Sequence, residues 1–378
     1  MRAVEVAGVG MHPFGRHGEK STTEMGVTAV RAALAEAGVG RGGFQAAFCA
    51  TAYGGVASGH KVLGALGMTG MPIVDVEAGC ASGGAALMVA AGAIAAGQYD
   101  TVLVFGVEKM PKGIIRSSFF EPWQEEAGLA ATPAYFALRA RRLMDSSGVT
   151  KDHLAAVVVK NRRHGVHNED AMFHSEVTAA DVLASRVVCE PLHLWMLCTP
   201  NEGAAAVVLR ANGGGPTGAV RLAAAVLRSH VPGAVLSEST PLSGLVEDDV
   251  IPPTTLAARD AYEQAGVGPE DLDVVECQDT DAARELLSYE ELALCGPGSS
   301  AELLESGATQ LGGRLPVNPS GGLLSKGEPL GASALGQVVE LVHQLRGECG
   351  ARQVPGARMA LSHTVGRGAN AGVVILAR

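Results

Sequence analysis

One cysteine of this 378-residue chain stands in a context that favours nucleophilic chemistry. Cys80 lies in the segment IVDVEAGCASGGAALMV, where a short β-branched run passes through small residues into an alanine-rich helical pattern. A cysteine that opens a helix meets free backbone N–H groups and a partial positive charge, which lower the pKa of its thiol. The small flanking residues permit a sharp turn and leave room for a substrate. We predict that Cys80 is a nucleophile; the alternative is a small buried cysteine that packs like alanine.

The other six cysteines lack this context. They are scattered along the chain, with no CxxC pair, and bring the total to an odd number, seven. This distribution indicates reduced thiols and neither a disulfide framework nor a zinc site, so we predict no metal in this chain. We interpret them as strand ends or packing positions: Cys49, Cys189, Cys198, Cys277, Cys295 and Cys349.

Composition argues against several classes of protein. The chain is 47% hydrophobic and 18% charged, which permits a large core, and its formal net charge of −10 argues against binding to nucleic acid or anionic membranes. No apolar run reaches the ~18 residues of a transmembrane helix, and the first residues lack the pattern of a signal peptide. We expect a cytoplasmic protein with no nucleic-acid partner and no membrane span.

The elements that must position Cys80 occur twice along the chain. Residues 33–51 and 261–279 both read as the end of a helix, a glycine-rich turn and an apolar strand that ends at a cysteine. The order βαββαββ is predicted in each half, so we expect an α/β fold built by duplication, divided into 1–214 and 215–378. The expected strands are 3–9, 44–50, 73–76, 101–107, 204–209, 220–227, 272–277, 315–317, 357–361 and 372–376, and the expected helices are 22–37, 81–96, 255–265 and 331–346.

A long insertion, about 108–203, separates the last two strands of the first half. It is richer in charged, aromatic and histidine residues than its surroundings. A structureless loop of this length is rare in a compact domain, so we expect a partly helical cover. Open α/β sheets bind ligands at the carboxyl ends of their strands, and the cover is expected to lie there.

Several blocks of the sequence resemble the thiolases. VEAGCASGGAAL resembles their nucleophile segment, NPSGGLLSKGEPLGASALGQ their third conserved block, and LSHTVGRGANAGVVIL their C-terminal glycine-rich block. Further blocks, among them EVTAADVLASRVVCEPL and VVECQDTDAARELLSYEELALC, are similar to the sterol-carrier-protein type of thiolase. The resemblance spans the whole chain. It implies the thiolase fold: two duplicated βαββαββ halves in a layered α/β/α/β/α arrangement, with a loop domain inserted in the first half.

The resemblance also implies a reaction. In a thiolase, the cysteine attacks a 3-ketoacyl-CoA, the C–C bond breaks, an acyl-CoA enolate leaves, and free CoA takes the acyl group. The expected activity is therefore that of an acyltransferase on CoA thioesters, with CoA as a co-substrate and no tightly bound cofactor. The residues that bind CoA are not identified; the basic run 160–163 either forms a solvated face or attracts the CoA phosphates.

Two blocks depart from the family pattern. Gly-His-Pro is replaced by Gly327-Glu328-Pro329, and the histidine and cysteine of His-Asp-Cys-Phe are replaced by Gln278 and Thr280. The resemblance implies that Glu328 is an auxiliary base and that Gln278 donates to an oxyanion, together with backbone amides around Gly366. His363 occupies what resembles the position of the family's second cysteine and is the expected acid/base, since imidazole titrates near neutral pH. The simpler alternatives are a solvated turn for Glu328, a strand-end cap for Gln278 and a backbone contact for His363.

The altered blocks imply an unusual substrate, such as a branched or aromatic 3-ketoacyl-CoA of the benzoylsuccinyl-CoA kind. Two alternatives remain: a retro-aldolase of acyl-CoA side chains on the same fold, which the retained Cys80 argues against, and a non-catalytic subunit, which the missing histidine favours. The resemblance implies a homodimeric core, for which strand 73–76 is a suitable edge, and a small zinc-ribbon/OB-fold protein as a partner.

Overall fold

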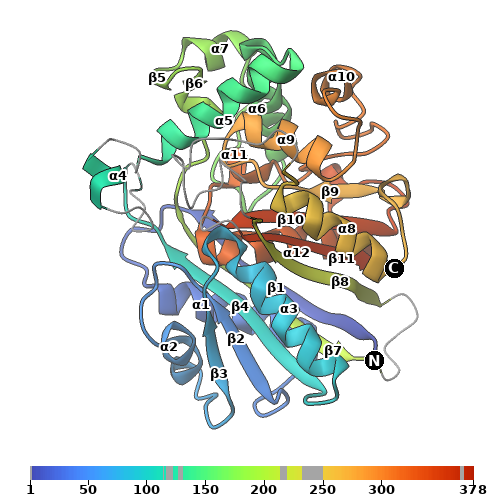
Figure 1. Cartoon of the computed structure of the whole chain (residues 1–378). Coiled ribbons are helices and arrows are strands. Elements are labelled where there is room, and N and C mark those ends of the chain that lie inside the picture. Colours follow the sequence, from blue (N-terminus) through green and yellow to red (C-terminus); the bar gives the residue numbers. More distant parts are fainter. Residues whose placement is uncertain are drawn as a thin grey trace.

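The computed structural model describes residues 2–113, 115, 122–126, 131–212, 219–231, 250–366 and 370–378. Its centre is a nine-stranded mixed sheet with the order β3-β2-β4-β7-β1-β8-β11-β10-β9 (Figure 1). The strands are β1 Val4–Gly15, β2 Ala46–Ala50, β3 Ile73–Val76, β4 Thr101–Lys109, β7 Glu202–Ala211, β8 Val220–Ser229, β9 Val274–Glu276, β10 Met359–Gly366 and β11 Asn370–Ala377.

The strand order is symmetric about the contact between β1 and β8. The first-half strands β1, β7, β4, β2 and β3 follow one another outward on one side, and β8, β11, β10 and β9 do so on the other. Val317 forms a single parallel bridge with Val275 of β9, at the place that β3 occupies in the first half. Every expected strand except 315–317 is therefore present, and the predicted duplication is confirmed. The expected boundary at 214/215 lies outside the described residues.

The helices form three layers around the two halves of the sheet. Helices α1 (Thr22–Glu36) and α2 (Ser58–Ala65) cover the outer face of the first half, and α8 (Pro253–Ala265) covers that of the second. Between the halves, α3 (Ser82–Ala95) and α12 (Leu330–Arg346) pack against each other and against strands of both. Their buried side chains share one apolar cluster with the strands, so the layered α/β/α/β/α arrangement is confirmed.

The insertion between β4 and β7 is largely helical and packs on the second half. It contains α4 Pro122–Glu126, α5 Thr132–Ser147, α6 Lys151–Gly165, α7 Ala179–Ala184 and the hairpin β5 Val187–Cys189 with β6 Leu192–His193. Helix α6 contacts three helices of the second half, which are α9 Ala282–Glu291, α10 Ser300–Glu305 and α11 Gly322–Lys326 (Figure 1). The 3-10 helices are Gly79–Ala81, Leu194–Met196, Pro269–Asp271 and Gly350–Arg352.

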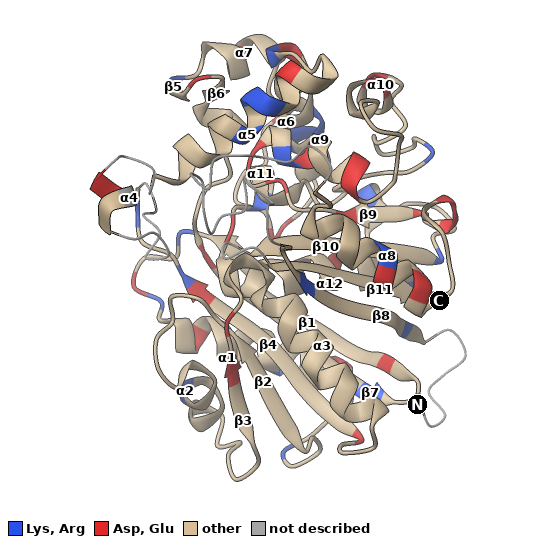
Figure 2. Ribbon diagram, in the orientation of Figure 1, with Lys and Arg blue, Asp and Glu red and all other residues tan. Residues whose placement is uncertain are grey.

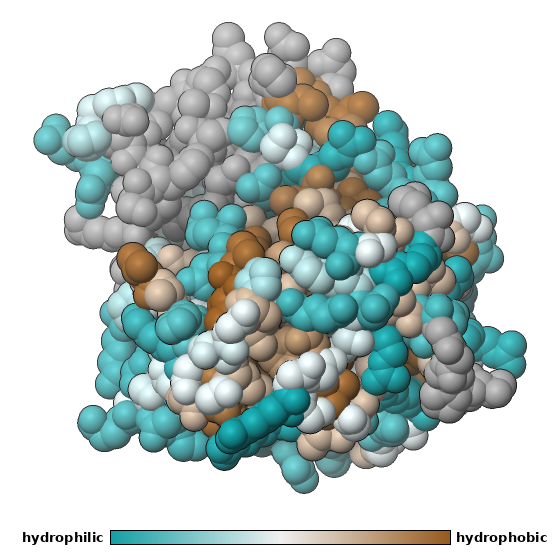
Figure 3. Space-filling model, turned by 90° about the horizontal axis from the view of Figure 1, so that it is seen from below, coloured by the Kyte–Doolittle hydropathy of each residue, from teal (hydrophilic) through white to brown (hydrophobic). Residues whose placement is uncertain are grey.

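Charged residues lie mainly on helices and loops, and those of the sheet lie near the ends of its strands (Figure 2). On the face seen in Figure 3, apolar residues form small patches that are separated by polar residues. Among the described residues, no helix is both long and apolar enough to cross a membrane. The edge strand β3 exposes Val74, and α3 exposes Val89, each by 44%.

Two glycines let α12 begin directly against the sheet. A Cβ on Gly106 of β4 would lie 2.2 Å from the Gly331 carbonyl oxygen, and a Cβ on Gly331 would lie 2.6 Å from the Ala50 carbonyl oxygen. The buried carboxylate of Glu108 accepts from the Gly331 N–H at 3.2 Å and from the Ala52 N–H at 2.8 Å. Backbone contacts therefore fix the start of α12 and the residues that precede it.

We expect Gly106→Ala to lower the free energy of unfolding by about 1–3 kcal/mol, because the backbone of α12 must move away from the added methyl group. Gly92→Ala is the matched control: Gly92 lies within α3, a methyl group added there would have nothing within 4 Å, and the change should raise stability by about 0.5–1 kcal/mol. Chemical denaturation measures both. An unchanged denaturation midpoint for Gly106→Ala would contradict the tight contact.

Candidate active site

Cys80 lies in the turn between β3 and α3, as predicted. Gly79 has a φ of 60°, and the Ser82 hydroxyl both accepts from the Ala78 N–H at 2.8 Å and donates to the Gly79 carbonyl at 2.6 Å. These bonds hold Cys80 within a 3-10 turn, Gly79–Ala81, that runs directly into the helix. Its side chain is 7% exposed and lines a cavity of about 1200 Å³.

Glu328 lines the same cavity, two residues before the start of α12. The preceding Gly327 has a φ of 82°, and a Cβ there would lie 2.0 Å from the Asn201 amide nitrogen. The Glu328 N–H donates to the Thr199 carbonyl at 2.9 Å. Glu328 is 5% exposed. It is therefore a buried, positioned carboxylate and not a solvated turn residue.

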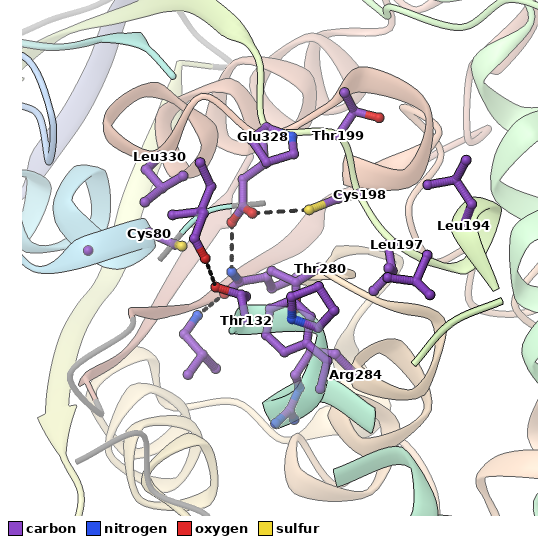
Figure 4. Close-up of a pocket in the computed structure, with 18 of the residues that line it drawn as sticks. Cys80, Thr132, Leu194, Leu197, Cys198, Thr199, Thr280, Arg284, Glu328 and Leu330 are labelled. Atoms are coloured by element: carbon purple, nitrogen blue, oxygen red, sulfur yellow. Dashed lines mark hydrogen bonds between the residues drawn. The ribbon is translucent and has the colours of Figure 1, made fainter. Parts of the chain in front are cut away.

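The Glu328 carboxylate is surrounded by hydrogen-bond donors. Oε2 accepts from the Cys198 thiol at 3.2 Å, Oε1 accepts from the Gln278 amide at 3.0 Å, and the Cys80 side chain also hydrogen-bonds to it. Figure 4 shows the carboxylate between the two sulfur atoms. Burial raises the pKa of Glu328 above its usual 4.5, although the three hydrogen bonds act in the opposite direction. A carboxylate with a raised pKa that contacts a thiol is suited to accept the thiol proton.

Cys198 is a member of this cluster that the sequence did not reveal. Its N–H donates to the Thr280 carbonyl at 2.9 Å, while Pro200 forms a bridge with Glu328. The segment around Cys198 therefore lies between the block that contains Gln278 and Thr280 and the block that contains Glu328. Burial raises the pKa of the Cys198 thiol well above 9, and the nearby charge of Glu328 raises it further, so this side chain stays a neutral donor. Its only sequence signal was a cysteine shortly before a predicted strand.

Both the oxygen and the nitrogen of the Gln278 side-chain amide form hydrogen bonds. Its carbonyl oxygen accepts from the Val365 N–H, and its NH₂ group donates to Glu328, which leaves one N–H for another acceptor. Gly366 lies behind the nucleophile turn, where a Cβ would be 2.0 Å from the Ala78 carbonyl oxygen. Val365, and not Gly366, lines the cavity. Residues 367–369 of the glycine-rich block lie outside the described residues.

The structure does not bring His363 into the cavity. Val365, on the same face of β10 and two residues nearer the strand end, lines the cavity, but His363 does not. Its ring is fully buried and hydrogen-bonds to the Thr254 hydroxyl at 3.0 Å. Burial lowers the pKa of His363 well below 6.5, and the charge of Arg284 acts in the same direction. His363 is therefore a neutral packing residue on the outer side of β10, and the expected acid/base is not at the site.

Arginines also line the cavity. Arg139 forms an ion pair with Asp281, and Arg284 forms one with Glu291. Arg162 instead stacks on the ring of Phe173, 3.9 Å from its centroid. In the part of the chain that the structure describes, no group of three or more His, Cys, Asp or Glu side chains is arranged to hold a metal ion.

Comparison with known proteins identifies the family of this chain. Residues 4–212 match the thiolase N-terminal domain family, and residues 245–378 match the thiolase C-terminal domain-like family. The chain therefore belongs to the thiolase superfamily.

Its relatives place it in the sterol-carrier-protein type. Over 97% of its length it is 35% identical to human sterol carrier protein 2, of which the match covers 70%. Over 98% of its length it is 36% identical to the benzoylsuccinyl-CoA thiolase subunit BbsB of Thauera aromatica, of which it covers 96%. The solved structure of the Ltp2-ChsH2(DUF35) aldolase shares the fold, with a TM-score of 0.87 and 24% identity over 99% of this chain and 98% of that one.

The contact between Glu328 and Cys80 predicts a pH dependence of thiol reactivity. Alkylation of Cys80 by iodoacetamide should fall as the pH drops through the raised pKa of Glu328, because the protonated carboxyl no longer accepts the thiol proton. Glu328→Gln should abolish this limb and slow alkylation near neutral pH. Glu328→His should keep part of the reactivity and move the limb toward about pH 6.5. Peptide-level mass spectrometry measures the rates, and superimposable profiles for the three proteins would exclude Glu328 as the base.

Proposed function

We propose that this protein is a thiolase-type acyltransferase that cleaves or forms the C–C bond of a 3-ketoacyl-CoA through an acyl-enzyme on Cys80. The observation that carries the proposal is the buried Glu328 carboxylate, hydrogen-bonded to the thiols of Cys80 and Cys198 within one cavity. Membership of the thiolase superfamily supports the reaction class.

In the first step Glu328 takes the proton of Cys80, and the sulfur attacks the keto carbon C3 of the substrate. The C2–C3 bond breaks, and its electron pair passes to the thioester as an enolate. Acyl-Cys80 is formed and Glu328 is protonated. The free N–H of Gln278 is placed to donate to an oxyanion at this stage.

Cys198 supplies the proton that the enolate requires. Its thiol gives a proton to C2, which releases acetyl-CoA or a related acyl-CoA with the original CoA, and the resulting thiolate recovers a proton from Glu328 at 3.2 Å. Glu328 is then a carboxylate again. It accepts the proton of an incoming CoA thiol, which attacks acyl-Cys80, and the departing Cys80 thiolate is reprotonated. In this scheme Cys198 takes the role that the sequence assigned to His363, and Gly366 supports the nucleophile turn.

The substrate we propose is a branched or aromatic 3-ketoacyl-CoA. The 36% identical relative is named for benzoylsuccinyl-CoA, and the cavity is lined by the aromatic side chains of Phe136, Phe173 and Trp195. The fold is shared with an aldolase, but cleavage of an aldol requires no thiol nucleophile. The paired thiols around Glu328 therefore favour thiolysis over the aldolase and over a non-catalytic subunit.

Incubation with benzoyl-CoA or acetyl-CoA should add the mass of the acyl group to the peptide that contains Cys80. Cys80→Ser should keep the fold and lose both the adduct and turnover, because a hydroxyl of far higher pKa does not replace the thiolate. Cys198→Ser is the matched control. It should still form the adduct on Cys80 while overall C–C cleavage slows by at least about tenfold. Unchanged turnover in Cys80→Ser would exclude it as the nucleophile.

We also propose a homodimeric core and a small zinc-ribbon/OB-fold partner. The exposed edge strand β3 supports the first, and the DUF35 component named in the related aldolase complex supports the second. Co-expression with a small zinc-binding protein encoded nearby should yield a stable complex by light scattering, raise activity and bring stoichiometric zinc. Full activity of the isolated homo-oligomer, with no stimulation by the neighbour, would count against the partner.

A further inference from the structure

We infer that Arg162 forms a carboxylate-binding subsite in the wall of the cavity, so that the acyl group of the substrate carries a free carboxylate. This inference rests on the proposed function, since it takes the cavity to hold an acyl-CoA. It adds a specific contact, between the Arg162 guanidinium and a carboxylate of the acyl group.

Within the described part of the chain, the guanidinium of Arg162 is buried without an anionic partner. The residue lies on α6, is 8% exposed and lines the cavity. Among the described residues its Nε has no hydrogen-bond partner, and no salt bridge joins it. One face of the group is covered by the Phe173 ring at 3.9 Å.

The other buried cations of this region are compensated. Arg139 pairs with Asp281, and Lys160 donates to the Val317 carbonyl at 2.8 Å and lies 2.9 Å from Glu285. Burial lowers the pKa of Arg162 to about 10, which still leaves it charged at neutral pH. An uncompensated buried charge is unfavourable, so an anion that enters the cavity gains from pairing with it.

The position of Arg162 favours an acyl carboxylate over the phosphates of CoA. The Phe173 N–H donates to the Ser325 carbonyl at 3.0 Å, and the Ser325 hydroxyl donates to the Asn161 carbonyl at 3.0 Å. These contacts place Arg162 beside the segment that leads to Glu328. Arg186, which also lines the cavity, is exposed and better suited to a hydrated phosphate.

The chemistry of the group points to the same ligand. A guanidinium presents a planar fork that matches a carboxylate with two parallel hydrogen bonds. The Phe173 ring contacts one face of the guanidinium, and Arg162 lines the cavity. The substrate class that follows is a 3-ketoacyl-CoA derived from a dicarboxylic acid, from which cleavage releases a fragment that keeps the carboxylate.

Binding to the Cys80→Ser protein tests the subsite without requiring catalysis. Isothermal titration compares succinyl-CoA with butyryl-CoA, whose four-carbon acyl groups differ in a terminal carboxylate. The variants Arg162→Met and Arg162→Lys are added in this background. Arg163→Gln, an exposed neighbour on the same helix, is the matched control.

We expect succinyl-CoA to bind on the order of tenfold to a hundredfold more tightly than butyryl-CoA. Arg162→Met should abolish this preference without weakening butyryl-CoA, Arg162→Lys should keep part of it, and Arg163→Gln should keep all of it. Thermal stability of Arg162→Met should be unchanged or higher, because a buried unpaired charge is removed.

Two results would overturn the inference: equal affinity for the two ligands in the parent protein, or an equal loss for succinyl-CoA, butyryl-CoA and free CoA in Arg162→Met, which would assign Arg162 to the CoA phosphates. Failure of the proposed function appears separately, as absence of the Cys80 adduct in the unmodified protein.

Discussion

The burial of the Glu328 carboxylate is the constraint on which the site depends. A carboxylate taken out of water without a cation, as Glu328 is among the described residues, is stable only when donors surround it. Here the donors come from three distant segments, the Cys80 turn, Cys198 and Gln278. The duplicated fold brings these segments together, because α3 and α12 pack side by side between the two halves.

The charges around the cavity separate structural from functional groups. Lys160 and Lys326 are almost fully buried, and each lies within 4 Å of an acidic side chain, Glu285 or Glu276. Glu328 has thiols and an amide where a cation would normally be, and Arg162 has an aromatic ring where an acid would be. A fold under selection for stability alone would pair or remove both groups. Their presence fits a site whose reacting proton and whose ligand supply the missing charge.

Sequence patterns predicted the parts of this protein whose cause is local. The Cys80 turn followed from the change from β-branched to small residues, and the resemblance of the third block located Glu328. Cys198 was missed because only tertiary pairing of its segment, with Thr280 on one side and Glu328 on the other, creates its role. His363 was placed at the site because a motif gives the position of a residue. Whether the side chain reaches the cavity depends on its depth in the strand, and His363 is fully buried although Val365, on the same face, lines the cavity.

Helix α6 of the insertion links the reacting centre to the choice of substrate. Asn161 donates to Asp279 at 2.7 Å and to Glu285 at 2.6 Å, and thus braces the block that holds Gln278. The next residue, Arg162, lines the cavity. Successive helix residues point about 100° apart, so one helix can brace the catalytic block and contact the acyl group with adjacent side chains. The two halves supply Cys80, Gln278 and Glu328. The insertion supplies Cys198, which contacts Glu328, and Arg162, the side chain proposed to select the acyl group.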